Sequence, residues 1–138
     1  LGDYVLNAED YFRRAVFADE IGRYCYGMDA HPRRLEDASR SVEDFKKLRL
    51  KKGESYGIPY RILTPRGLHN VLAAGRCVST DRSVQSSLRV MPGCFILGQA
   101  AGVAAAMTAA GDADIRSLSV PELQGRLAEL GAYLPNRA

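Results

Sequence analysis

The sequence predicts an α/β protein, in the form of an α+β fragment that carries few strands. Residues 70–75 (Asn-Val-Leu-Ala-Ala-Gly) form a short continuous apolar run, which is typical of a strand covered on both faces of a parallel sheet. A loop follows this run, and a helix rich in Ala and Gly follows the loop. The other candidate strands are too few to complete a doubly wound sheet, so we expect the sheet partners of this run to lie outside the 138 residues.

Composition and charge indicate an ordinary globular domain. The chain has 46% hydrophobic and 25% charged residues, and its net charge of +3 does not by itself indicate a nucleic-acid partner. The longest apolar run, residues 94–110, is short and Ala-rich and contains Gln99 and Thr108, so we expect no membrane span. The sequence begins with Leu1 rather than Met, and we expect it to have been processed or cut from a longer chain.

The first third of the chain combines a helix start, a short strand and a charged stretch. Residues 3–6 fit the end of a strand, and Asn7 then offers a cap for a helix whose first turn is acidic. Residues 24–26 (Tyr-Cys-Tyr) predict a short strand. Residues 33–52 carry many charges of both signs, which predicts a solvent-exposed helix or excursion. Acidic residues interrupt the basic ones and no aromatic platform accompanies them, so we expect no nucleic-acid partner.

An extended segment and a turn precede the apolar run. Residues 58–64 read as extended, with Pro59 suited to an edge or a strand start, and residues 65–67 (Pro-Arg-Gly) turn the chain. We expect Arg61 and Arg66 in this region to be structural or exposed.

Two helices follow, each with its own start and stop signals. Pro92 suits the first turn of a long helix, where a missing N–H costs nothing, and Gly111 suits its end. Ser119 and Glu122 form a capping box for a last helix, which Gly131 ends.

The cysteines and histidines do not indicate a metal site. The three cysteines, Cys25, Cys77 and Cys94, contain no CxxC pair, and the two histidines, His31 and His69, lie far apart in the sequence. We therefore expect no zinc. We expect free, buried cysteines and a reducing, cytoplasmic location.

The loop at residues 76–91 is the candidate site, because ligands bind beyond the carboxyl ends of strands in open α/β sheets. The positive end of the long helix points there and favours an anion or a polarised carbonyl. Arg76 and Arg89 would add charge, each as a ligand contact or as part of a structural ion pair, and Asp81 fits a simple turn cap. Four backbone amides are expected to donate there: those of Arg89, Val90, Met91 and Gly93.

Small residues recur at helical spacing along the long helix, at Gly98, Ala101, Gly102, Ala105 and Ala109. Such a stripe lets a helix pack tightly on a sheet, and its first turn can also lie against a flat cofactor. The sequence leaves both roles open.

Four segments together resemble the C-terminal part of bacterial FAD-dependent oxidoreductases, a group distantly akin to fumarate reductase flavoproteins. These segments are IPYR at 58–61, NVLAAGRC at 70–77, RVMPGC at 89–94 and GQAAGVAAA at 98–106. The upstream stretches LGDYVLNAEDYF and YGMDAH are also similar to the family, whereas the charged stretch at 33–52 looks like a variable insertion.

The resemblance implies the C-terminal portion of a two-domain flavoprotein that uses FAD and a small-molecule substrate. Residues 1–57 would belong to the substrate or cap domain. Residues 58–138 would supply the closing strand and helices of a Rossmann-like FAD-binding domain. The glycine fingerprint of that domain would lie in a missing N-terminal segment, so we expect the isolated chain to be inactive and to bind FAD weakly.

The resemblance also implies roles for particular residues. Arg89 would lie close to the flavin ring or the substrate, and His31 would lie on the side of the substrate domain, so these two are the catalytic candidates. The residues that would contact the cofactor are Ala74, Gly75, Arg76, Arg89, Val90, Met91 and Gly93. The alternative is a non-catalytic folding or oligomerisation module, which would form a homo-oligomer through its small-residue helix.

Overall fold

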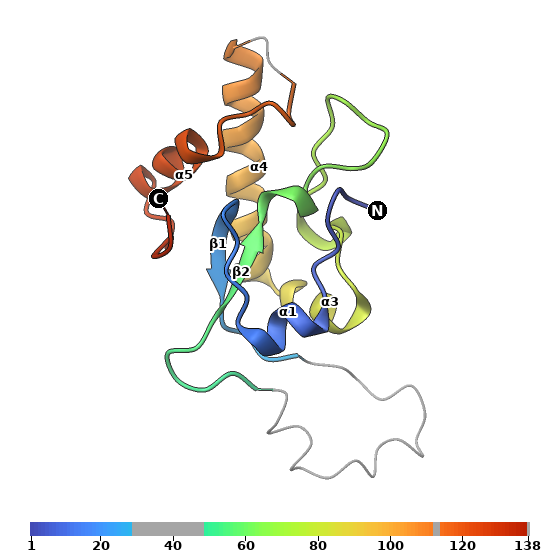
Figure 1. The fold of residues 1–138 in the computed structure, drawn as a ribbon, viewed down its shortest axis with the longest axis vertical. Helices are drawn as coiled ribbons and strands as arrows, with labels where there is room; N and C mark the ends of the chain where they lie inside the picture. Colours follow the sequence, from blue (N-terminus) through green and yellow to red (C-terminus); the bar gives the residue numbers. More distant parts are fainter. Residues whose placement is uncertain (29–48, 112–113, 138) are drawn as a thin grey trace.

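The computed structural model describes residues 1–28, 49–111 and 114–137, and it places helices around a small two-stranded sheet (Figure 1). This mixture of helices and a small sheet agrees with the predicted α+β class. In chain order the helices and strands are α1 (Ala8–Arg13), β1 (Glu20–Tyr24), β2 (Tyr56–Pro59), α3 (Arg82–Leu88), α4 (Met91–Gly111) and α5 (Val120–Glu129). Two 3₁₀ turns, Tyr60–Ile62 and Gly75–Cys77, complete the regular structure of the described residues.

The sheet pairs β1 with β2 in antiparallel register, with Gly22 opposite Ile58 and Tyr24 opposite Tyr56. The strand expected at residues 24–26 therefore lies earlier than predicted. The extended segment expected at 58–64 is also shorter, because the chain enters a 3₁₀ turn directly after Pro59.

A buried ion pair lies at the start of β1. The Arg23 Nη1 atom donates to Glu20 Oε1 at 2.6 Å, and the two side chains are 7% and 2% exposed. Arg23 also donates to the carbonyl of Ser55 at 2.7 Å, next to β2. The charges of both side chains are therefore compensated inside the core, as a buried pair requires.

The helix α1 begins as the sequence predicts. The Asn7 side chain accepts from the amides of Glu9 and Asp10, and the Asp10 carboxylate accepts from the Asn7 amide, so the capping box is complete. Residues 3–6, predicted as a strand end, form no strand within the described ranges; Leu6 makes an isolated bridge with Thr80, and the amides of Asp3 and Tyr4 donate to residues 64 and 61.

The carboxylate of Asp81 caps two helices at once. Its Oδ1 atom accepts from the amide of Val84 at 2.8 Å in α3, and its Oδ2 atom accepts from the amide of Ala8 at 2.7 Å in α1. The backbone amide of Asp81 donates to the carbonyl of Leu6 at 2.8 Å. One side chain thus joins the N-terminal segment to the candidate site loop.

The long helix α4 begins one residue before Pro92 and ends at Gly111, as predicted. Only one side of it is buried, through Gly93, Leu97, Ala100, Ala104 and Thr108. Among the described residues, α4 is the one helix whose length and composition would suffice to cross a membrane. The helix is longer than the apolar run at 94–110, from which the sequence predicts no membrane span. The same helix packs against β1 and α5.

The last helix, α5, begins and ends where the sequence predicts. The Ser119 hydroxyl accepts from the amide of Glu122 at 3.4 Å, and Gly131 has a φ of +88° just beyond the helix. The side chain of Gln124 donates to the carbonyls of Ala18 and Glu20, each at 3.0 Å, which fixes α5 against the start of β1.

The strand predicted for residues 70–75 does not form. The segment is irregular, and Val71 is 42% exposed. The amide of Ala73 donates to the carbonyl of Leu63, but no strand lies beside this segment among the described residues. An apolar run can form a buried strand only when neighbouring strands accept and donate its backbone hydrogen bonds.

We expect Asp81→Ala to lower the free energy of unfolding by about 2–3 kcal/mol, because two helix caps of about 0.5–2 kcal/mol each are lost. Asp81→Asn keeps hydrogen-bond acceptors and a capping side chain, so its loss should be smaller. Glu129→Ala, at an exposed position, should change stability by less than about 0.5 kcal/mol. Urea denaturation measures all three, and equal losses for Asp81→Ala and Glu129→Ala would contradict the double cap.

Candidate functional site

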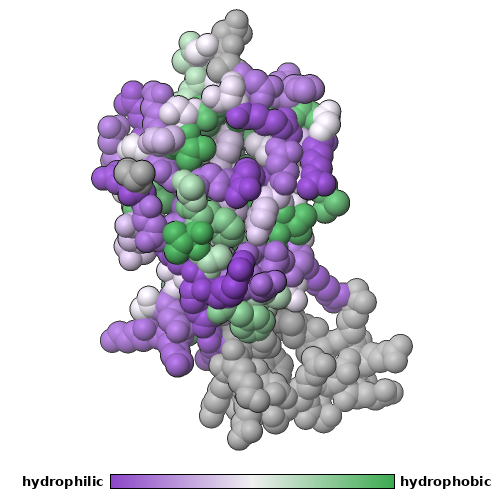
Figure 2. Space-filling model, viewed as in Figure 1, coloured by the Kyte–Doolittle hydropathy of each residue, from purple (hydrophilic) through white to green (hydrophobic). Residues whose placement is uncertain are grey.

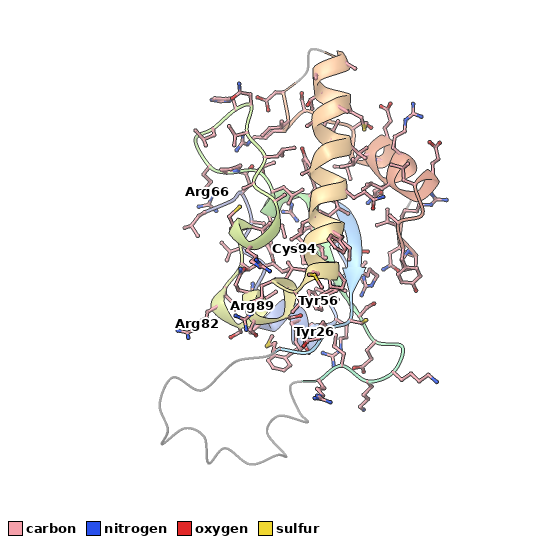
Figure 3. All side chains as sticks on the ribbon, turned by 180° about the vertical axis from the view of Figure 1, so that it is seen from behind. Tyr26, Tyr56, Arg66, Arg82, Arg89 and Cys94 are labelled. Carbon is pink, nitrogen blue, oxygen red and sulfur yellow. The ribbon has the colours of Figure 1, made fainter. Side chains whose placement is uncertain are left out.

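The candidate site is built from the Gly75–Cys77 turn, the end of α3 and the start of α4 (Figure 3). Gly75 has a φ of +74°, a conformation that favours glycine, and an added Cβ would meet no atom within 4 Å. The preceding residue, Ala74, accepts a hydrogen bond at 3.1 Å from the thiol of Cys77. The turn therefore has open space at Gly75, whereas Ala74 packs against the core.

The two arginines of the site are held close together by the backbone. The Nε atom of Arg76 donates to the carbonyl of Arg89 at 3.1 Å, and both residues are exposed. Neither forms an ion pair within the part of the chain that the structure describes. Arg61 differs, because its guanidinium pairs with Asp19 at 2.9 Å, as the structural role predicted for it requires.

The backbone amides of the site are less available than predicted. The amide of Arg89 donates to the carbonyl of Gln85 at 3.1 Å, because α3 continues its hydrogen-bond pattern into this residue. The prediction of a free Arg89 amide is therefore wrong. Val90 is half-buried and packs against the core, whereas the Met91 side chain is 67% exposed.

Gly93 lies where the start of α4 meets the end of α3. It is buried, and a Cβ at this position would lie 2.4 Å from the carbonyl oxygen of Leu88. Burial raises the pKa of the nearby Tyr24 hydroxyl, and a hydrogen bond with the Gly93 backbone acts in the opposite direction. Gly93 thus faces the interior of the described chain and sets how tightly the two helices meet.

A buried hydrogen-bond chain lies beneath the site. The Ser87 hydroxyl donates to the carbonyl of Tyr26 at 2.7 Å, so the Tyr56 hydroxyl, 2.8 Å away, donates to Ser87. Burial raises the pKa of Tyr56 far above its usual range, so this hydroxyl keeps its proton at physiological pH. Figure 3 shows Tyr26 and Tyr56 near the start of α4. The sequence does not predict this chain, because no local pattern relates residues 56 and 87.

The small-residue stripe of α4 is largely uncovered. Four of its residues, Gly98, Gly102, Ala105 and Ala109, are exposed, and Ala101 is half-buried. An open cavity of about 760 Å³ lies between this stripe and residues 69–72. In Figure 3, α4 runs along the front of the molecule. Figure 2 shows the opposite face, on which hydrophobic residues form separate small spots.

The remaining predicted residues lie outside this arrangement. His31 and most of the charged stretch at 33–52 fall outside the described residues. The three cysteines are free, as predicted, but they are not buried: Cys25 and Cys77 are exposed and Cys94 is half-buried. Cys77 lies in the turn after Gly75, at the molecular surface, which explains why the prediction of burial was wrong.

A comparison with protein families identifies the chain. The model of the family described as FAD dependent oxidoreductase matches residues 1–127. The chain belongs to this family. The family implies FAD as the cofactor of the complete protein, as the sequence resemblance predicted. Searches of curated proteins and of solved structures found no match.

In this FAD dependent oxidoreductase chain, Gly93→Ala should be strongly destabilising. Because the new methyl group would lie 2.4 Å from the Leu88 carbonyl oxygen, α3 and α4 must separate, and we expect a loss of about 1–3 kcal/mol. Gly98→Ala is the matched control in the same helix, since its methyl group meets no atom within 4 Å and Ala favours the helix by up to about 1 kcal/mol. Thermal unfolding compares them, and equal stability of the two variants would contradict the close packing.

Proposed function

We propose that this chain is the C-terminal portion of an FAD-dependent oxidoreductase and that residues 74–76 and 89–91 face the flavin. The observation that carries the proposal is the pair of exposed arginines, Arg76 and Arg89, without an ion pair among the described residues beside the start of a 21-residue helix. Uncompensated guanidinium groups at a helix amino end favour an electron-rich or anionic ligand.

The residues of the site fit the cofactor in shape and charge. The open position at Gly75, next to the half-buried Ala74, would leave room for a flat ring, and Arg76 and Arg89 would orient its polar edge. The half-buried Val90 and exposed Met91 would offer backbone and apolar contacts at the first turn of α4. Gly93 would act indirectly, by keeping that turn close to α3. When bound, FAD would supply the capacity to accept and donate electrons, and the protein would supply orientation and electric field.

A Rossmann-like domain would also account for the surfaces that the described chain leaves open. Residues 70–75 carry an apolar sequence without strand partners, and the stripe of α4 beside them is uncovered. We propose that an N-terminal segment of the complete protein supplies the missing strands and the glycine fingerprint. Residues 58–138 would then be the closing part of the FAD-binding domain, and residues 1–57 part of a substrate domain for a small molecule, in a cytoplasmic enzyme.

A second candidate is a module that forms a homo-oligomer through α4. The exposed side chains of Met91 and Phe95, 67% and 69% exposed, favour some partner at this face. The arginine pair distinguishes the two proposals, because an apolar contact between copies gives no role to uncompensated charges.

The first test uses the complete protein with its FAD. Arg89→Ala should weaken FAD binding roughly tenfold or more, the loss expected for a hydrogen bond to a charged group. Arg82→Ala is the control, since Arg82 is exposed on the neighbouring helix α3 (Figure 3). Fluorescence titration of the apoprotein with FAD measures both constants. Equal affinity in the two variants would argue against Arg89 as a cofactor contact.

The second test uses the 138-residue chain by itself. Because the diphosphate-binding fingerprint is absent from its sequence, we expect no stoichiometric flavin spectrum after addition of FAD and gel filtration. Tight binding of FAD by this chain would contradict its incompleteness. A stable dimer in sedimentation, together with an unchanged FAD affinity in the Arg89→Ala holoenzyme, would favour the oligomerisation module.

A further inference from the structure

Three hydrogen bonds form a closed ring between Gln85 and the two arginines of the candidate site. The Nε2 atom of Gln85 donates to the carbonyl of Arg76 at 2.7 Å, and the Nε atom of Arg76 donates to the carbonyl of Arg89 at 3.1 Å. The backbone amide of Arg89 donates in turn to the carbonyl of Gln85 at 3.1 Å. Arg76 is thus held at its backbone by Gln85 and at its guanidinium by Arg89.

The side-chain amide of Gln85 has one orientation that satisfies both of its neighbours. The carbonyl of Arg76 can only accept a hydrogen bond, so the amide nitrogen of Gln85 faces it. The Oε1 atom of Gln85 then accepts from the hydroxyl of Thr80 at 2.8 Å. Both ends of this half-buried amide are therefore engaged, which fixes the donor that reaches Arg76.

The bond from Gln85 is the shortest one at the Gly75–Cys77 turn among the described residues. Within the turn itself, the amide of Val78 donates to the carbonyl of Gly75 at 3.4 Å. This distance exceeds the usual N–H···O range of about 2.7–3.2 Å, whereas the bond from Gln85 lies at its short end. The place of Arg76 in the turn therefore depends on the Gln85 side chain more than on the hydrogen bond of the turn.

The terminal nitrogens of the Arg76 guanidinium remain available to a ligand. Arg76 is exposed, and of its guanidinium only Nε has a hydrogen-bond partner in the part of the chain that the structure describes. A guanidinium is planar and carries its donors in a rigid fork, so a bond at Nε also restricts the directions of the terminal N–H groups. The ring of hydrogen bonds thus orients Arg76 before any ligand binds.

We propose that Gln85 is a positioning residue of the flavin site, which holds Arg76 so that its terminal nitrogens meet the cofactor. This inference rests on the proposed function and adds to it a residue that acts through Arg76 rather than on the flavin. A donor that is ordered before binding raises affinity, because less side-chain entropy is lost on binding. Without the Gln85 amide, Arg76 keeps its charge but has to be ordered when FAD binds.

The test is a double-mutant cycle in the complete protein, with FAD affinity measured by fluorescence titration of the apoprotein. Gln85→Met keeps the length of the side chain and loses its amide, so it should weaken FAD binding roughly two- to tenfold, the contribution of one hydrogen bond. In an Arg76→Ala background the same change should have no further effect, because the guanidinium that Gln85 positions is absent. Equal losses in the two backgrounds would overturn the proposal, since they would show that Gln85 serves the fold alone.

Two further variants on the same segment serve as the graded change and the control. Thr80→Val removes the hydroxyl that orients the Gln85 amide, so it should weaken FAD binding in the same direction and by less than Gln85→Met. Ser83→Ala on α3 should leave the affinity unchanged, because the Ser83 hydroxyl has no hydrogen-bond partner among the described residues.

The arginine variants separate failure of this inference from failure of the flavin site. If Arg76→Ala weakens FAD binding and Gln85→Met does not, the positioning role is overturned and the flavin site stands. If Arg76→Ala and Arg89→Ala both leave the affinity unchanged, the proposed flavin site is overturned, and the role of Gln85 with it.

Discussion

The buried ion pair between Glu20 and Arg23 fixes the position of β1, and the rest of the described structure is arranged around that strand. Arg23 extends the pairing to the backbone beside β2 through Ser55, and Gln124 of α5 donates to the carbonyl of Glu20. Removing one partner of such a pair leaves a buried charge without compensation, at a typical cost of about 3–5 kcal/mol. The two strands and the last helix therefore depend on a single charge-compensated centre.

Two glycines determine how β1 and α3 pack against α4 beside the candidate site. At Gly22 in β1, a Cβ would lie 2.6 Å from Ile96 of α4, so only glycine lets the helix pack this closely on the strand. Three residues earlier in α4, Gly93 lets the same helix meet the end of α3. The start of α4 is thus located by close contacts on two sides, with the Ile96 side chain against Gly22 and with the Leu88 carbonyl against Gly93. Arg89, one residue beyond α3, is held at a defined place beside that start.

The sequence predicts well what is encoded locally. Pro92, Ser119 and Gly131 identify the limits of α4 and α5 because caps and breakers act within one helical turn. The strand at residues 70–75 could not be judged in this way, because its formation depends on strands elsewhere. The double cap by Asp81 was missed for the same reason: its second amide lies 73 residues away in the sequence. Likewise, no pattern indicates that Arg76 donates to the carbonyl of Arg89.

The direct pairing of β1 with β2 has a consequence for how the chain tolerates changes in length. The two strands are antiparallel neighbours, and both described ends of their connection are anchored: Met28 is buried after β1, and the Ser55 carbonyl accepts from Arg23 before β2. Doubling the length of a flexible connection costs only about 0.6 kcal/mol in closure entropy. Insertions or an epitope tag between these two anchors should therefore leave the core intact, whereas deletion of either anchor should not.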